Sequence, residues 1–136
     1  MTGVFADTNY WIALINARDQ LHSKAIAISE RLSAFEIVTS EMVLVEVLNT
    51  FSNAGWLLRD LAVSSIEAIR LNPRIRIIPQ TTEQFRSALD RYRRATDTSW
   101  SLTDCASFQI MDQQRMFTAI TYDQHFVQAG YEALLR

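Results

Sequence analysis

Four carboxylates stand beside or inside apolar segments of this chain, where a hydrophobic core would normally exclude them: Asp7, Glu46, Asp104 and Asp123. Asp7 and Asp123 each follow a short apolar segment, Asp104 begins one, and Glu46 interrupts one. If the fold brings these side chains together, they form a negatively charged pocket that requires a divalent cation.

The energetics of such a pocket indicate its chemistry. Two carboxylates ~4 Å apart repel each other by about 4 kcal/mol at an effective dielectric constant near 20. Three or four of them stay ionised only around a cation; otherwise some are protonated. Oxygen ligands favour Mg²⁺ or Mn²⁺ over zinc. Such an ion can activate water and stabilise an attack on phosphorus, so the acids predict metal-dependent phosphoester hydrolysis.

Each acid also has a structural explanation. Asp7 and Asp123 could cap the helices that follow them. Asp104 could form a capping box with Ser101, at the Ser-x-x-Asp spacing. Glu46 could pair with a buried arginine. It is nevertheless the hardest of the four to explain, because a glutamate in the middle of an apolar helix gains nothing as a cap.

Small polar residues near the acids could support them. Thr8 and Thr103 directly adjoin two of the acids, and Thr121 lies near a strand end, so each could hold a carboxylate by a hydrogen bond. Asn9 could orient Asp7 or a metal-bound water. A structural role stays open for Thr121, because threonine is favoured in strands.

Other polar residues point away from alternative chemistries. We expect structural roles for His22 and His125, because neither has metal-ligand spacing to a partner. Cys105, the only cysteine, is expected in the core and excludes an intrachain disulfide. Asp112 is not an expected ligand, since it lies eight residues beyond Asp104 and so ~12 Å further along the same helix.

The composition predicts one compact domain over residues 1–136. Of its residues, 49% are hydrophobic and 21% charged, and 2 prolines and 3 glycines leave no flexible linker. The start lacks the features of a signal peptide, and no apolar stretch approaches the ~18 residues that span a bilayer. We therefore expect a cytoplasmic protein without membrane contact.

The net charge of −2 does not indicate a nucleic-acid-binding protein, but the arginines are unevenly distributed. Six of them fall between positions 74 and 94. Arginine binds phosphate bidentately, so this cluster could contact a phosphate backbone. The alternative is a solvated helix face with salt bridges.

Short apolar strands alternate with helices along the chain. Strands are predicted at 4–6, 36–39, 74–78, 116–121 and 131–134, and helices at 9–17, 22–34, 41–54, 57–71, 82–94, 102–113 and 123–129. Ser40 is the predicted N-cap of the third helix. The alternation predicts an α/β fold, a three-layer α/β/α sandwich with a short, mostly parallel central sheet. Ligands of such sheets bind at the carboxyl ends of the strands, where Asp7 and Asp123 stand.

Four segments of the chain resemble, in order and spacing, the motifs of PIN-domain nucleases. They are Phe5-Ala6-Asp7-Thr8-Asn9, the segment from Ser40 to Val47, Trp100-Ser101-Leu102-Thr103-Asp104-Cys105, and Thr121-Tyr122-Asp123-Gln124-His125-Phe126. The sequence is most similar to the VapC-type toxins of bacterial toxin–antitoxin pairs. The resemblance extends from Asp7 to Gly130.

The resemblance implies an endoribonuclease that uses Mg²⁺ or Mn²⁺ to cleave single-stranded or structured RNA. It assigns metal binding and catalysis to Asp7, Glu46, Asp104 and Asp123. It also implies products with 5′-phosphate and 3′-hydroxyl ends, a homodimer, and inhibition by a cognate antitoxin. The alternatives are an RNA-processing PIN nuclease without an antitoxin, a non-catalytic module that binds metal or RNA, and a small Mg²⁺-dependent phosphatase with a substrate pocket.

Overall fold

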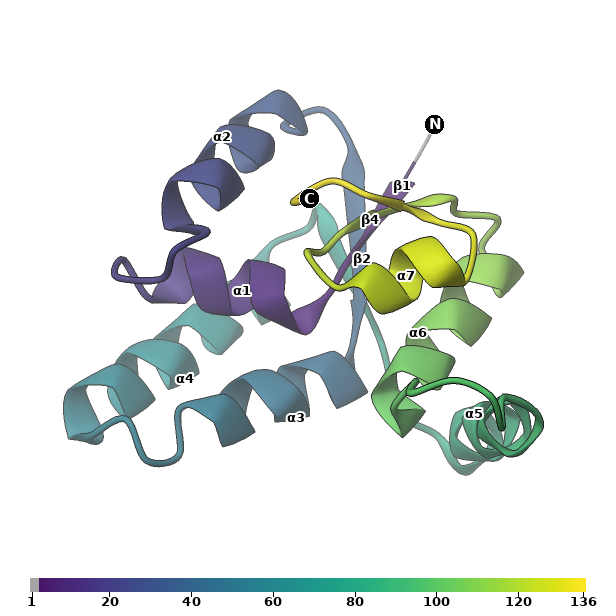
Figure 1. The fold of residues 1–136 in the computed structure, drawn as a ribbon. Coiled ribbons are helices and arrows are strands. Elements are labelled where there is room, and N and C mark those ends of the chain that lie inside the picture. The colour runs from purple at the N-terminus through teal and green to yellow at the C-terminus, as the bar shows by residue number, and fades with distance from the viewer. Residues whose placement is uncertain (1–2) are drawn as a thin grey trace.

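A five-stranded parallel sheet forms the centre of the molecule in the computed structural model, which describes residues 3–136 (Figure 1). The strand order is β3-β2-β1-β4-β5, and every neighbouring pair is parallel. The strands are β1 (Gly3–Ala6), β2 (Glu36–Ser40), β3 (Ile75–Ile78), β4 (Thr118–Ile120) and β5 (Glu132–Ala133). The predicted α/β fold with a mostly parallel sheet is therefore confirmed.

Seven helices connect the strands of the described chain. They are α1 (Thr8–Ile15), α2 (His22–Arg31), α3 (Glu41–Thr50), α4 (Trp56–Leu71), α5 (Thr82–Arg94), α6 (Leu102–Gln113) and α7 (Gln124–Gln128). Helices α1 to α4 lie on one side of the sheet and α5 and α6 on the other, which gives the predicted three layers (Figure 1). No helix within residues 3–136 combines the length and apolar character needed to cross a membrane.

Strand β1 occupies the middle of the sheet, between β2 and β4. Its residues Val4, Phe5 and Ala6 are buried, as expected for a strand covered by helices on both faces. The backbone N–H of Asp7 donates to the carbonyl oxygen of Ile120 at 3.2 Å, so the chain leaves β1 beside the end of β4. This contact fixes the position of the first acid.

The predicted bounds are accurate for α5 and α6, whereas the predicted ends of α1, α2 and α3, at residues 17, 34 and 54, lie beyond the observed ends at Ile15, Arg31 and Thr50. The prediction carried α3 to residue 54, but the helix ends at Thr50 and a turn follows. Gly55, which has φ +92°, is the N-cap residue of α4. The glycine therefore reverses the chain before the next helix, at a backbone conformation that other residues rarely adopt. The predicted N-cap Ser40 is confirmed, since its hydroxyl accepts from Val43 N at 3.1 Å.

The arginine cluster is largely occupied in ion pairs and carbonyl contacts. Arg76 pairs with Glu36, Arg91 with Asp112, and both Arg93 and Arg94 with Asp90. Arg74 donates to two backbone carbonyl groups. The salt-bridged helix face is therefore the alternative that the structure favours for this segment.

Candidate active site

The four predicted acids gather at the carboxyl end of the sheet, and we call Asp7, Glu46, Asp104 and Asp123 the acidic cluster. Asp7 follows β1, Asp123 follows β4, and Asp104 lies in the first turn of α6. Glu46 lies on α3, which begins directly at the end of β2. Elements far apart in the sequence therefore bring these carboxylates to one edge.

Asp7 is the most buried acid of the cluster, with 6% of its surface exposed. Its Oδ2 accepts a hydrogen bond from Thr121 Oγ1 at 2.8 Å. Although Asp7 is the N-cap residue of α1, its side chain makes no capping hydrogen bond, so the capping alternative is wrong for this residue. Its pKa is raised to about 7, mainly by burial, with a smaller contribution from the negative charges of Asp104 and Glu46. Asp104 and Glu46 therefore both lie within electrostatic reach of Asp7.

Glu46 faces helix α1 from the middle of α3. Its Oε1 accepts from Thr8 Oγ1 at 2.5 Å, a contact that joins the two helices next to Asp7. Within residues 3–136 no arginine or lysine forms an ion pair with Glu46, so the predicted alternative of a buried arginine partner is not observed. A threonine hydroxyl is a neutral donor and leaves the negative charge of the glutamate in place.

Asp104 forms the capping box that its spacing from Ser101 predicted. Asp104 N donates to Ser101 Oγ, and Asp104 Oδ2 accepts from Ser101 N, both at 3.0 Å. The same Oδ2 lies 2.8 Å from Nδ1 of His125. Its Oδ1 has no hydrogen-bond partner among the described residues. The structural and the metal-binding interpretations are therefore compatible, because capping uses one oxygen only.

Asp123 caps α7, and the cap brings a histidine into the cluster. Asp123 Oδ1 accepts from the backbone N–H of His125 at 2.9 Å and lies 3.4 Å from His125 Nδ1. Asp104, Asp123 and His125 each present one possible ligand atom within 4.8 Å of the others. A structural role was predicted for His125, because it has no metal-ligand spacing to a partner. Its two-residue separation from Asp123, at the start of a helix, is the sequence signal that places it beside the acids.

Thr121 links the two sides of the cluster. Its hydroxyl donates to Asp7 and accepts from the backbone N–H of Asp123 at 3.0 Å and from Asn9 Nδ2 at 3.4 Å. Asn9 Oδ1 in turn accepts from the N–H of Tyr122 at 3.1 Å. The predicted supporting residues Asn9 and Thr121 therefore share one hydrogen-bond network around Asp7.

The other two threonines differ from each other. Thr8 holds Glu46, whereas within residues 3–136 the carboxylate of Asp104 bonds to Ser101 and His125 and not to the adjacent Thr103. Asp112 points away from the cluster and bonds to Tyr131 and Arg91 instead, as its position eight residues beyond Asp104 predicts. A position at the end of a strand therefore predicts contact with the acidic cluster better than proximity in sequence to one of the acids.

The residues of the cluster suit a divalent cation. The buried Asp7 carboxylate lies close to two further acids, and a cation would offset the repulsion that favours its protonated form. Free carboxylate oxygens are hard donors of the type that Mg²⁺ and Mn²⁺ bind. The arrangement can therefore hold a metal ion at the edge of the sheet.

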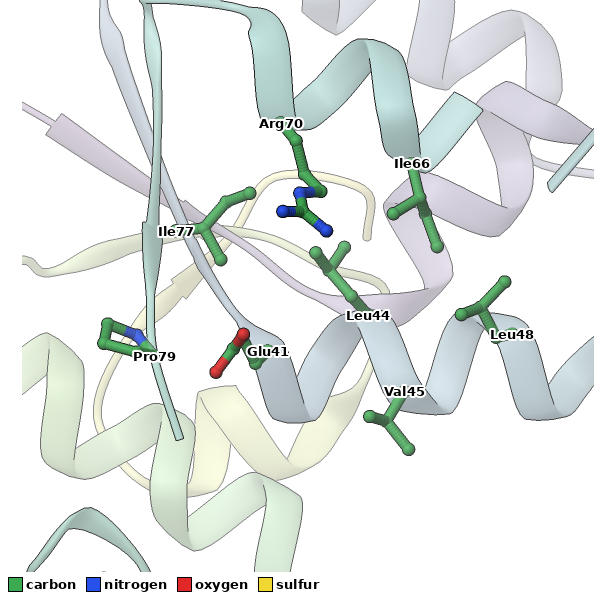
Figure 2. A pocket seen from close by; sticks show the side chains of 8 residues that line it. All are labelled: Glu41, Leu44, Val45, Leu48, Ile66, Arg70, Ile77 and Pro79. Carbon is green, nitrogen blue, oxygen red and sulfur yellow. The ribbon is translucent and has the colours of Figure 1, made fainter. Parts of the chain in front are cut away.

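A separate cavity of about 360 Å³ lies between α3, α4 and β3 (Figure 2). Its walls are mainly apolar, with Leu44 and Leu48 from α3 and Ile66 from α4. Glu41 and Arg70 are its charged residues. None of the four acids lines this cavity, so it does not provide the substrate pocket around the acids that a phosphatase would require.

Comparisons with known proteins agree with this geometry. The model of the PIN domain family matches residues 4–130. The 23S rRNA-specific endonuclease VapC20 from two strains of Mycobacterium tuberculosis is 30% identical over 131 residues, which cover 94% of this chain and 95% of the relative.

Two solved structures are similar. The crystal structure of M. tuberculosis VapC20, described as a sarcin-ricin loop cleaving toxin, has a TM-score of 0.79 and 29% identity, covering 94% of this chain and 95% of that chain. VapBC2 from Rickettsia felis, bound to a DNA fragment from its promoter, has a TM-score of 0.71. At 15% identity over 97% of this chain and 96% of that chain, it supports the fold alone.

Proposed function

The chain belongs to the PIN-domain family, with VapC-type relatives, and from this premise we propose that it is a metal-dependent endoribonuclease that hydrolyses phosphodiester bonds of RNA. The observation that carries the proposal is the convergence of the four acids at one edge of the sheet. Thr8 joins Glu46 to the start of α1 beside Asp7, Thr121 joins Asp7 to the backbone of Asp123, and Asp104 and Asp123 offer ligand atoms within 4.8 Å of each other. Buried and mutually repelling carboxylates at the end of a parallel sheet are costly for folding and are explained by a cation.

Asp7, Glu46, Asp104 and Asp123 are the proposed metal ligands and catalytic residues, and Mg²⁺ or Mn²⁺ is the proposed ion. When bound, such an ion activates water and neutralises charge at the attacked phosphate. Thr8, Asn9 and Thr121 are proposed to support the ligands, the first through Glu46 and the other two around Asp7. We keep Thr103 as an expected supporting residue, although no hydrogen bond of its side chain supports that role within residues 3–136.

The biological role is proposed from the relatives. VapC20 acts on 23S rRNA and is described as a toxin, so we propose a structured or single-stranded RNA substrate and the toxin role in a toxin–antitoxin pair. The proposal includes a cognate antitoxin, a homodimer, a cytoplasmic location and a single nuclease domain over residues 1–136. The family match to residues 4–130 supports the last point, since it leaves only short ends outside.

The test is RNA digestion by the purified protein with Mg²⁺, with Mn²⁺ and with EDTA. We expect cleavage with either ion, none with EDTA, and products that carry 5′-phosphate and 3′-hydroxyl ends. An Asp7→Ala variant, purified in the same way, controls for contaminating nucleases. Intact RNA in all conditions would contradict the proposal, and cleavage of a phosphate monoester alone would identify a phosphatase.

The partner is tested by coexpression with the product of any small reading frame adjacent to this one. We expect a stable complex in which RNA cleavage is inhibited. An active nuclease with no inhibitory neighbour would instead favour an RNA-processing enzyme.

A further inference from the structure

We propose that His125 is a nitrogen ligand of the ion held by the acidic cluster, and that it shifts the preference of the site from Mg²⁺ towards transition ions such as Mn²⁺. This inference rests on the proposed function, because it requires that the acids bind a divalent cation. It adds a residue to the ligand set and a metal preference that the four carboxylates alone would not give.

The position of the imidazole supports this role. Nδ1 of His125 lies 2.8 Å from Asp104 Oδ2 and 3.4 Å from Asp123 Oδ1. The side chain is 23% exposed, so it lies at the rim of the site and not within the core. The N–H of its own backbone donates to Asp123 Oδ1 at 2.9 Å, which fixes the start of α7 against the acid. Asp123 therefore positions the ring of His125, and the two side chains would bind the ion together.

The distances agree with the geometry of an octahedral ion. Ligand atoms about 2.1 Å from such an ion and at right angles to each other lie about 3.0 Å apart. The two nitrogen–oxygen distances, 2.8 and 3.4 Å, lie on either side of this value. Because the ligand atoms of Asp104, Asp123 and His125 all lie within 4.8 Å of one another, they can share a cation after side-chain movement.

The second histidine shows what a purely structural imidazole looks like in this chain. Nδ1 of His22 lies 2.6 Å from the carbonyl oxygen of Ala13. A carbonyl oxygen only accepts hydrogen bonds, so Nδ1 of His22 carries the hydrogen and has no lone pair to give. Nδ1 of His125 faces two carboxylates instead. Without metal it donates to Asp104 in the same way, but a cation held by these carboxylates can displace that hydrogen, which is released to solvent, and bind the nitrogen.

A nitrogen donor changes which ion the site prefers. Mg²⁺ takes oxygen ligands, whereas affinity for nitrogen-containing sites increases along the first-row transition series. Three or four carboxylates alone would accept Mg²⁺ and Mn²⁺ with little distinction. One imidazole in the ligand set is expected to favour Mn²⁺ in direct competition.

The experiment uses Mn²⁺ as the probe and detects a directly bonded nitrogen by pulsed electron paramagnetic resonance. The chain has 2 histidines, so a His22→Asn variant is a matched control for His125→Asn. We expect nitrogen hyperfine coupling in the wild type and in His22→Asn, and its loss in His125→Asn. The amide oxygen of the new side chain can still accompany the acids, so Mg²⁺ binding should persist. The ratio of Mn²⁺ to Mg²⁺ affinity should fall at least about tenfold in His125→Asn only.

The outcomes separate this inference from the proposed function. Bound Mn²⁺ without nitrogen coupling in the wild type would show that His125 only donates to Asp104, which overturns the inference and leaves the nuclease proposal intact. Coupling that persists in His125→Asn would also overturn it. Failure of the wild type to bind Mn²⁺ or Mg²⁺, together with RNA cleavage in EDTA, would overturn both.

Discussion

The acidic cluster has two halves, which differ in the groups that donate hydrogen bonds to their carboxylates. Asp7 and Glu46 form the first half, and Asp104 and Asp123 form the second. Asp7 and Glu46 accept side-chain hydrogen bonds from threonine hydroxyls. Asp104 and Asp123 accept from backbone N–H groups at the starts of α6 and α7 and lie beside His125. Both kinds of hydrogen bond stabilise a carboxylate, and the backbone N–H groups at a helix start add the favourable field of the helix dipole.

The difference shows which half most needs a cation. Burial raises the pKa of Asp7 to about 7, so near neutral pH its carboxylate is only partly ionised without metal. Asp104 and Asp123 serve as helix caps whether or not an ion is bound. Metal binding requires the ionised form of Asp7, which destabilises the metal-free fold. Asp104 and Asp123, in contrast, stabilise the fold as caps in the same ionised form that binds metal.

The largest predicted effect is the loss of cleavage in Asp104→Asn. The variant keeps the capping interaction, because asparagine also accepts from the backbone, but it loses the negative charge. We expect kcat for RNA cleavage to fall at least about a thousandfold with an unchanged fold. Asp112→Asn is the matched control on the same helix, since Asp112 bonds to Tyr131 and Arg91, outside the cluster. Equal activity in both variants would contradict the assignment.

The second prediction concerns stability in EDTA. Between pH 3.8 and about 7 folded Asp7 holds a proton that the unfolded chain has released, so the free energy of unfolding falls as pH rises through this window. Asp7→Asn removes this fall. At pH 8 it should therefore be more stable than the wild type, by up to about 4 kcal/mol at about 1.4 kcal/mol per pH unit. The two proteins should converge below pH 4 in urea titrations.

Asp123→Asn tests whether this effect belongs to the first half alone. Asparagine is as good an N-cap as aspartate, so we expect a change in the free energy of unfolding within about 0.5 kcal/mol across the same pH range. A stabilisation as large as that of Asp7→Asn would show that the two halves do not differ.

The third prediction concerns the pH dependence of metal binding. Below about pH 7 the proton on Asp7 competes with the ion, so the association constant for Mn²⁺ should rise roughly tenfold per pH unit and level off above about 7. Calorimetric titration measures this slope. An affinity independent of pH between about 5 and 7 would place Asp7 outside the ligand set.

The smallest predicted effect compares two threonines. Thr8→Val removes the hydroxyl that holds Glu46 and should weaken Mn²⁺ binding about tenfold. Thr118→Val is the control, because the Thr118 hydroxyl donates to Glu132, outside the cluster, and the Mn²⁺ affinity of this variant should stay within about twofold of the wild type. Equal losses in both variants would show that the contact between Thr8 and Glu46 does not position the metal ligand.

Local signals in the sequence were sufficient for much of the fold. Ser40 and the Ser101–Asp104 pair occur as the predicted caps, because such caps involve residues close in sequence. The acids after β1 and β4 lie at the predicted edge, since parallel strands end together there. The predicted end of α3, at residue 54, was wrong, because the helix ends at Thr50 and Gly55 already belongs to the start of α4.

Contacts between distant segments were harder to predict. The hydrogen bond between Thr8 and Glu46 and the approach of His125 to Asp104 depend on how the helices pack on the sheet. No spacing rule within one segment contains that information. The apolar cavity between α3, α4 and β3 likewise arises from packing and had no local signal.

The central claim is that the four carboxylates bind one shared ion site, and anomalous diffraction from crystals grown with Mn²⁺ tests it most directly. We predict a metal peak about 2.0 to 2.3 Å from carboxylate oxygens of Asp7 and Asp104, with Glu46 and Asp123 bound directly or through water. A crystal in which these oxygens bind no ion at a Mn²⁺ concentration that supports RNA cleavage would contradict the claim.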